Sequence, residues 1–140
     1  MLTVIEKVIF LQNIDIFSEV PTESLAALAA IAEEVSFLKG DQIFKEHDRA
    51  DALYLVLDGK VKLHRGKEEI AEATGMKAFG TWALFDEEPR VVTATCAEDS
   101  RLLRIDREDF IDLLADHVQV AQGILKTVVK RLRSLVEKVA

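Results

Sequence analysis

The chain has 140 residues, a formal net charge of -7 and 49% hydrophobic residues. This length and composition fit one ordinary folded domain and exclude a disordered chain. The acidic balance argues against general affinity for nucleic acid, because counterion release needs clustered cationic side chains, so we expect no direct DNA binding.

Several chemical classes are also excluded by the residues that the chain lacks. Cys96 is the only cysteine, which excludes disulfide frameworks and thiolate metal sites within one chain. An enzyme would need a nucleophile–base pair, a carboxylate dyad or converging metal ligands, and His47, His64 and His117 have no such spacing. We therefore expect no catalytic residues, no metal and no cofactor. No apolar run approaches the roughly 18 residues of a membrane span, so a cytoplasmic protein without a membrane segment is expected.

Residues 1–34 are expected to form helices. Apolar positions in 2–12 recur at three- and four-residue spacing, which is typical of a short amphipathic helix. Pro21 suits a first helical turn and Glu23 suits its positive end, so a second helix is predicted from there. Its buried stripe is predicted to contain Leu25, Leu28, Ala29, Ala32 and Val35.

After Val35 the pattern changes to short runs rich in β-forming residues, separated by glycine or charged turns. This density of short strands predicts a barrel, a sandwich or a jelly roll. The strand at 52–57 is apolar on both faces and is predicted to be central. The predicted strands are 35–39, 42–46, 52–57, 60–64, 69–74, 91–97 and 101–105.

Two further helices are predicted after the strands. Asp106 is expected to cap the first of them by accepting from a free backbone amide. The final helix, 118–139, has an apolar stripe wide enough to cover the strands or a second subunit, which predicts a homodimer through this helix. The stripe comprises Leu125, Val128, Val129, Leu132, Leu135, Val136 and Val139, and a basic group, interpreted as a solvated face, comprises Lys126, Lys130, Arg131, Arg133 and Lys138.

Four groups of residues follow one another in a distinctive order. They are Lys39-Gly40-Asp41 before Ile43-Phe44, Leu53-Tyr54-Leu55-Val56 before Asp58-Gly59-Lys60-Val61, Phe79-Gly80 with Ala83-Leu84, and Pro89-Arg90. In this order the chain resembles the cyclic nucleotide-binding domain, the β-roll of catabolite-activator-type regulators, protein kinase regulatory subunits and gated channels. The resemblance implies a mainly β fold with flanking helices: an eight-stranded β-roll or jelly roll over 35–106, a phosphate-binding cassette at 79–92, and C-terminal helices over 107–140, all in one domain, 1–140.

The residues of the cassette are expected to bind a phosphate. Gly80 lacks a Cβ, so an anion can approach the backbone N–H groups that follow it. Arg90 can give a phosphate two parallel N–H bonds, although an ion pair with Asp86, Glu87 or Glu88 is the open alternative. The resemblance implies cyclic AMP or cyclic GMP as the ligand, with Gly80, Thr81, Trp82, Ala83, Arg90, Val91, Val92 and Leu135 as ligand-binding residues.

The same sequence departs from the family pattern at several ligand positions. Thr81 stands where a ribose-binding glutamate is usual, Val91-Val92 where a hydroxyl and a small residue are usual, and Leu135-Val136 where base-reading hydroxyls are usual. His47 occupies a turn position where glycine is usual. Two hypotheses follow. The domain is a sensor that signals through helix 118–139 to an unidentified protein partner, or it is a degenerate fold that serves as a dimerisation or interaction module. Either way we expect the output to come from a separate partner or from a longer protein.

Overall fold

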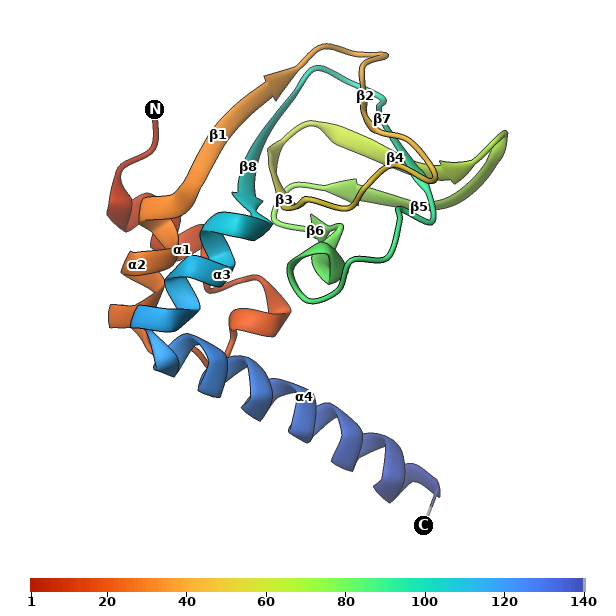
Figure 1. The fold of residues 1–140 in the computed structure, drawn as a ribbon. Coiled ribbons are helices and arrows are strands. Elements are labelled where there is room, and N and C mark those ends of the chain that lie inside the picture. Colours follow the sequence, from red (N-terminus) through yellow and green to blue (C-terminus); the bar gives the residue numbers. More distant parts are fainter. Residues whose placement is uncertain (140) are drawn as a thin grey trace. The chain divides into compact units, whose positions relative to one another are not determined.

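The computed structural model describes residues 1–139, which form two compact units. The first unit spans Ile31–Ile111 and contains all eight strands of the described chain (Figure 1). The second unit comprises Leu2–Ala30 and the segment from Asp112 onward, and it is helical.

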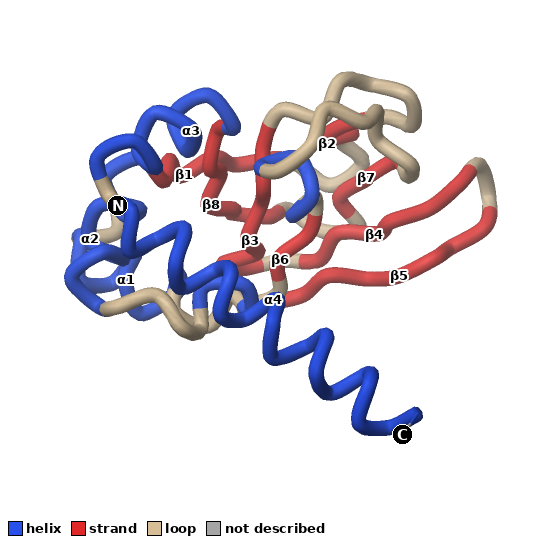
Figure 2. The backbone as a smooth tube through the Cα atoms, turned by 60° about the horizontal axis from the view of Figure 1, so that its bottom comes forward, coloured by secondary structure: helices blue, strands red, loops and turns tan. Residues whose placement is uncertain are grey.

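The strands of the first unit form two antiparallel four-stranded sheets (Figure 2). One sheet has the order β1-β8-β3-β6, with β1 at Ala32–Phe37, β8 at Ser100–Asp106, β3 at Ala52–Asp58 and β6 at Ala78–Phe79. The other has the order β2-β7-β4-β5, with β2 at Gln42–Phe44, β7 at Thr93–Cys96, β4 at Lys60–Arg65 and β5 at Glu68–Thr74. The predicted eight-stranded roll is confirmed.

The core of this unit lies between the sheets and includes an aromatic cluster. Phe44, Tyr54 and Phe79 pack with ring centroids 5.5–6.1 Å apart, a separation at which aromatic pairs attract beyond simple burial. Strand β3 is buried from Ala52 to Val56 and lies between β8 and β6, which confirms the prediction of a central strand. The full cluster is Phe44, Ala52, Tyr54, Val56, Val61, Ala73, Phe79, Ala94, Cys96 and Leu102.

Several sequence predictions about the strands were wrong. Ala32 was expected on the second helix, but it lies in β1 and pairs with Ile105 of β8; Val35, which the predicted stripe of that helix shared with the predicted strand 35–39, lies in β1 and pairs with Leu102. Pairing with a distant strand overrides the helical period there, because cross-strand contacts stabilise a sheet more than local propensity does. Strand β6 has only two residues and was too short for the pattern to reveal. Strand β7 begins at Thr93 and not at residue 91.

The turn between β3 and β4 depends on Gly59, whose φ is +110°. A side chain there would be strained by backbone conformation alone. Its Cβ would also lie 2.7 Å from the Asp99 carbonyl oxygen and the Ser100 Cα. The amide of Lys60 donates to the Ser100 hydroxyl at 3.1 Å, so this turn is fixed against the start of β8. Gly59 therefore has a structural role in the roll.

Two of the helices begin with side-chain caps. Helix α1, Val4–Leu11, starts with a capping box in which Thr3 and Glu6 bond each other's backbone amides. A short 3-10 turn, η1, follows at Asp15–Phe17, and α2 spans Thr22–Ile31. Helix α3, Arg107–Asp116, is capped by Asp106, whose carboxylate accepts from the amides of Glu108 at 2.8 Å and Asp109 at 3.3 Å. The predicted cap is confirmed.

Helix α4, Val118–Val139, has the bounds that its apolar period predicts. It is joined to the region around η1 by ion pairs from Lys130 to Glu19 and from Arg131 to Asp15. Both cationic side chains are nevertheless exposed, which agrees with the interpretation of the basic group as a solvated face; their carboxylate partners come from η1 and from the segment that follows it. Six residues of the apolar stripe are exposed in the structure, at 43–65%: Leu125, Val128, Val129, Leu132, Leu135 and Val136.

Candidate ligand-binding site

The cassette begins where β6 ends. Gly80 follows Phe79 with a left-handed backbone, φ +72°, and precedes the 3-10 helix η2 at Thr81–Leu84. The amide of Ala83 donates to the Gly80 carbonyl oxygen at 3.1 Å and closes the turn. A Cβ at position 80 would lie 2.5 Å from Nη1 of Arg90 and 3.2 Å from the Ala52 carbonyl oxygen. Glycine is required here both by the backbone conformation and by the approach of Arg90.

Arg90 is buried, with 7% of its surface exposed. Its Nη2 donates to the Ala52 carbonyl oxygen at 2.7 Å and lies 3.7 Å from the Asp51 carboxylate. The guanidinium carbon is 4.0 Å from the centroid of the Phe44 ring, a cation–π distance. Burial lowers the pKa of the guanidinium, and the charges of Tyr54 and Asp51 oppose that shift. Arginine nevertheless stays protonated in proteins, so a permanent positive charge is held beside Gly80.

The open alternative for Arg90, an ion pair with a carboxylate at positions 86–88, was wrong. Glu87 pairs instead with Arg107, at 3.3 Å, and the Asp86 carboxylate accepts from the Glu88 amide at 3.2 Å. The acidic partner of Arg90 is Asp51, which the chain brings close at the start of β3. Proximity in sequence favoured 86–88, but the antiparallel arrangement of the strands decides which carboxylate reaches the guanidinium.

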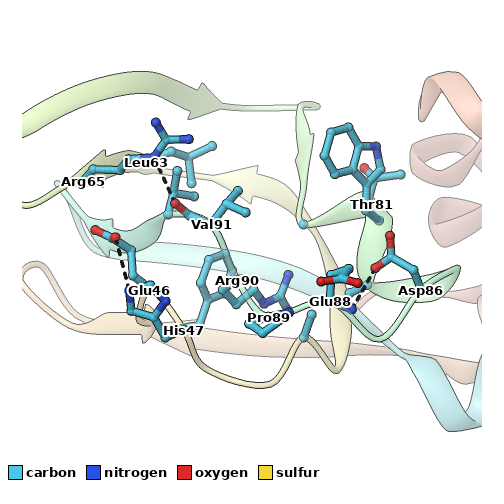
Figure 3. A pocket seen from close by; sticks show the side chains of 16 residues that line it. Glu46, His47, Leu63, Arg65, Thr81, Asp86, Glu88, Pro89, Arg90 and Val91 are labelled. Carbon is cyan, nitrogen blue, oxygen red and sulfur yellow. Dashed lines mark hydrogen bonds and ion pairs between the residues drawn. The ribbon is translucent and has the colours of Figure 1, made fainter.

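A cavity of about 850 Å³ opens at this cassette (Figure 3). This volume is within the range of small-molecule sites. Seven of the eight predicted site residues line it: Gly80, Thr81, Trp82, Ala83, Arg90, Val91 and Val92. The eighth, Leu135, is an exposed residue of α4 and is not among the lining residues. The ligand-binding role of all eight stays a prediction.

The sequence reasoning missed part of the wall. The additional lining residues are Phe44, Glu46, His47, Ala50, Leu63, Arg65, Asp86, Glu88 and Pro89. Leu63 and Arg65 were within reach of sequence reasoning, because alternate residues of a strand share one face. Arg65 is fixed in place by its Nε, which donates to the Val91 carbonyl oxygen at 3.1 Å. In Figure 3, Arg65 and Leu63 lie on one side of Arg90, and Thr81 and Asp86 lie on the other.

The turn at Glu46–Asp48 is held directly to the backbone of Arg90. The His47 amide donates to the Arg90 carbonyl oxygen, and the Arg90 amide donates to the Asp48 carbonyl oxygen, both at 2.8 Å. His47 has a φ of +72°, which strains a residue with a side chain. This positive φ explains why glycine is usual at the position of His47 in the family pattern.

Replacing His47 with Gly is expected to stabilise the fold relative to His47→Ala by about 0.5–1 kcal/mol. The left-handed backbone costs alanine about 1–2 kcal/mol, and the larger unfolded-state entropy of glycine offsets part of that cost. Urea unfolding of both variants measures the difference. Equal free energies of unfolding would mean that the backbone at position 47 is unstrained.

Metal binding, membrane insertion and thiol chemistry were also considered for residues 1–139. Among residues 1–139 no cluster of histidine, cysteine or carboxylate side chains is arranged to hold a metal ion. Within the same residues, no helix has both the length and the apolar character that crossing a bilayer requires. Cys96 is buried, and that burial raises the pKa of its thiol.

Comparison with known proteins identifies the family. Residues 34–117 match the family model described as the cyclic nucleotide-binding domain. The "CRP-like cAMP-activated global transcriptional regulator" of Mycobacterium tuberculosis is 32% identical over 123 residues, which cover 84% of this chain and 55% of that protein. The "Cyclic AMP receptor protein" of Thermus thermophilus is 37% identical over 100 residues, 68% of this chain and 46% of that protein.

A solved structure is similar over nearly the whole chain. The crystal structure of the N-terminal domain of a transcriptional regulator from Streptomyces coelicolor is 32% identical, has a TM-score of 0.84, and aligns over 94% of this chain and 95% of its own. The chain therefore belongs to the cyclic nucleotide-binding domain family, and it is a regulatory domain of the catabolite-activator type. It spans about half the length of the curated relatives that it matches.

Proposed function

We propose that this chain is a non-catalytic sensor domain, and that it binds cyclic AMP, cyclic GMP or a related phosphate ligand at the Gly80–Arg90 cassette. The observation that carries the proposal is the buried Arg90 guanidinium, which lies against Gly80 in the wall of an 850 Å³ cavity. A buried cation is costly unless it is paired, and a ligand phosphate would supply that pairing.

The hydrogen bonding of Arg90 also supports a ligand. Its Nε is buried and has no hydrogen-bond partner among residues 1–139. Buried polar atoms are rarely left without a partner in folded proteins, so this atom of a cavity-lining residue calls for an explanation. Cyclic AMP, which the names of two relatives contain, carries a phosphate that would suit this atom as a partner.

The departures from the family pattern are expected to weaken binding without abolishing it. Thr81 is partly exposed and lines the cavity, so its hydroxyl can still contact a ribose directly or through water. Replacing a charged hydrogen bond with a neutral one costs roughly ten- to a hundredfold in affinity. We therefore expect a dissociation constant in the micromolar range.

The output is proposed to run through α4. Its exposed apolar stripe offers a surface for a second copy of the chain or for a separate protein partner. Ligand binding would shift that helix between two positions and so change the contact. In this proposal the whole chain acts as one cytoplasmic regulatory domain, and it does not itself contact DNA.

Thermal unfolding followed by the fluorescence of Trp82, the only tryptophan, tests ligand binding. Cyclic AMP and cyclic GMP are each added at about 1 mM, beside AMP and inorganic phosphate as controls. A dissociation constant of about 10 μM would add about 2.7 kcal/mol and raise the midpoint by several degrees. A midpoint that no cyclic nucleotide moves would count against the sensor.

A specific observation also favours the second candidate function, a degenerate interaction module. Arg90 already has internal partners in the Ala52 carbonyl oxygen and the Asp51 carboxylate, so its charge is partly satisfied without ligand. In that case the protein would self-associate through α4 independently of nucleotide. Sedimentation with and without cyclic nucleotide distinguishes the two functions, because only the sensor predicts that the ligand changes the degree of self-association.

A further inference from the structure

A second arginine lines the cavity at some distance from the cassette in sequence. Arg65 is the last residue of β4, and its Nε is committed to the Val91 carbonyl oxygen. No hydrogen bond or ion pair joins its two terminal nitrogens, Nη1 and Nη2, to any residue in the described range 1–139. The hydrogen bond to the Val91 carbonyl oxygen fixes the position of the guanidinium, and Nη1 and Nη2 can still donate to a ligand.

The surroundings of Arg65 suit a flat ring. Leu63 precedes it on the same face of β4, and Val91 follows Arg90 on the facing segment; both line the cavity. Figure 3 shows these three labelled residues together on the side of Arg90 away from Thr81. A ligand whose phosphate contacts Arg90 and whose ribose lies near Thr81 would extend its base toward apolar side chains and a guanidinium.

The donor pattern of that guanidinium distinguishes purines. An arginine fork offers only N–H donors, and it matches the adjacent O6 and N7 acceptors of guanine in a bidentate pair. Adenine presents an amino donor at the corresponding edge, so it would place donor against donor. Glutamine, which carries both a donor and an acceptor, is the side chain that matches adenine at N6 and N7.

We propose that Arg65 reads the base of the bound nucleotide and makes this domain selective for a ligand with a carbonyl-bearing purine, cyclic GMP, over cyclic AMP. This inference rests on the proposed function, because it requires a nucleotide at the cassette. It assigns base reading to β4, whereas the family pattern places it on hydroxyls of the final helix that this chain replaces with Leu135-Val136.

The test compares cyclic GMP, cyclic IMP and cyclic AMP by calorimetric titration of the whole chain. Cyclic IMP has the O6 and N7 acceptors of cyclic GMP but lacks the 2-amino group, so it isolates the contribution of Arg65. Cyclic GMP and cyclic IMP are expected to bind about 5- to 150-fold more tightly than cyclic AMP, the discrimination of a good bidentate pair.

Two variants and a control assign that preference to the side chain. Arg65→Ala is expected to bring the three affinities within about threefold of one another, and Arg65→Gln to favour cyclic AMP. Arg49→Gln is the matched control, because Arg49 is exposed, carries the same charge and is not among the cavity-lining residues. It should keep the wild-type preference.

The outcomes separate this inference from the proposed function. A wild type that binds cyclic AMP as tightly as cyclic GMP, or a preference that persists in Arg65→Ala, overturns base reading by Arg65 and leaves the sensor intact. A folded wild type that binds none of the three nucleotides overturns both. Unfolding curves of each variant confirm that the comparison is made on folded protein.

Discussion

Arg90→Lys is expected to weaken binding of cyclic nucleotide at least 30-fold while leaving the unliganded fold close to wild type. Lysine keeps a positive charge near Phe44 and Ala52, but it cannot give a phosphate two parallel N–H bonds. Each charge-assisted hydrogen bond lost costs about 1.5–3 kcal/mol. Fluorescence titration at Trp82 measures the affinity, and Arg49→Lys, outside the cavity, is the control.

Arg90→Ala should act on stability as well as on binding. It leaves the buried Ala52 carbonyl oxygen without its donor, which costs about 1–3 kcal/mol, or roughly 5–10 °C in the unfolding midpoint. Comparing the two variants separates the binding role from the structural one. If Arg90→Lys bound nucleotide as tightly as wild type, the phosphate would be held elsewhere.

Gly80→Ala offers an independent approach to the same arginine. The added Cβ would lie 2.5 Å from Nη1, at the end of the Arg90 side chain, so we expect the guanidinium to be displaced. A side chain at φ +72° adds about 1–2 kcal/mol of backbone strain, which we expect the fold to tolerate. We expect the ligand-induced rise in midpoint to be lost. A retained rise would show that the close approach of Gly80 and Arg90 is not needed for binding.

Gly59→Ala is expected to be the most destabilising of these substitutions, by about 3–5 kcal/mol. The backbone at φ +110° and the collision with Asp99 and Ser100 act together. Two of the three nearest atoms, the Asp99 carbonyl oxygen and the Ser100 Cα, belong to the backbone and cannot move cheaply. Denaturant unfolding measures the loss.

Gly40→Ala is the matched control for Gly59→Ala. Gly40 also has a positive φ, +91°, but a Cβ there would meet no atom within 4 Å. Its expected cost is therefore the backbone strain alone, about 1–2 kcal/mol. Equal losses for the two variants would mean that the contact with β8 contributes nothing to the turn.

Gly59 and Gly80 both have positive φ angles, but the groups packed against them differ. Gly59 fixes the roll by allowing β3 and β4 to turn against the start of β8. Gly80 performs a similar backbone role, but the group that it admits is a charged side chain beside a cavity. Substitution of Gly59 is therefore expected to lower the stability of the fold, and substitution of Gly80 is expected to weaken ligand binding.

Local patterns in the sequence predicted most of the fold correctly. The alternation in 52–57 identified a central strand, Asp106 was recognised as a cap, and the period of 118–139 gave the bounds of the last helix. These features depend on residues within a few positions of one another. The prediction failed for Ala32, because its conformation depends on pairing with a residue about seventy positions away, Ile105.

The candidate site, too, was predicted in part from the sequence and in part only from the tertiary structure. By itself the sequence determined the family, because short motifs in a fixed order along the chain carry that signal, and it predicted a cassette at 79–92 with Gly80 and Arg90 as its main residues. Only the tertiary structure decided that Arg90 contacts Asp51, Ala52 and Phe44, and that Arg65 shares its cavity. Those partners come from separate segments and from both sheets, and the packing of the two sheets around one core brings them together irrespective of their distance along the chain.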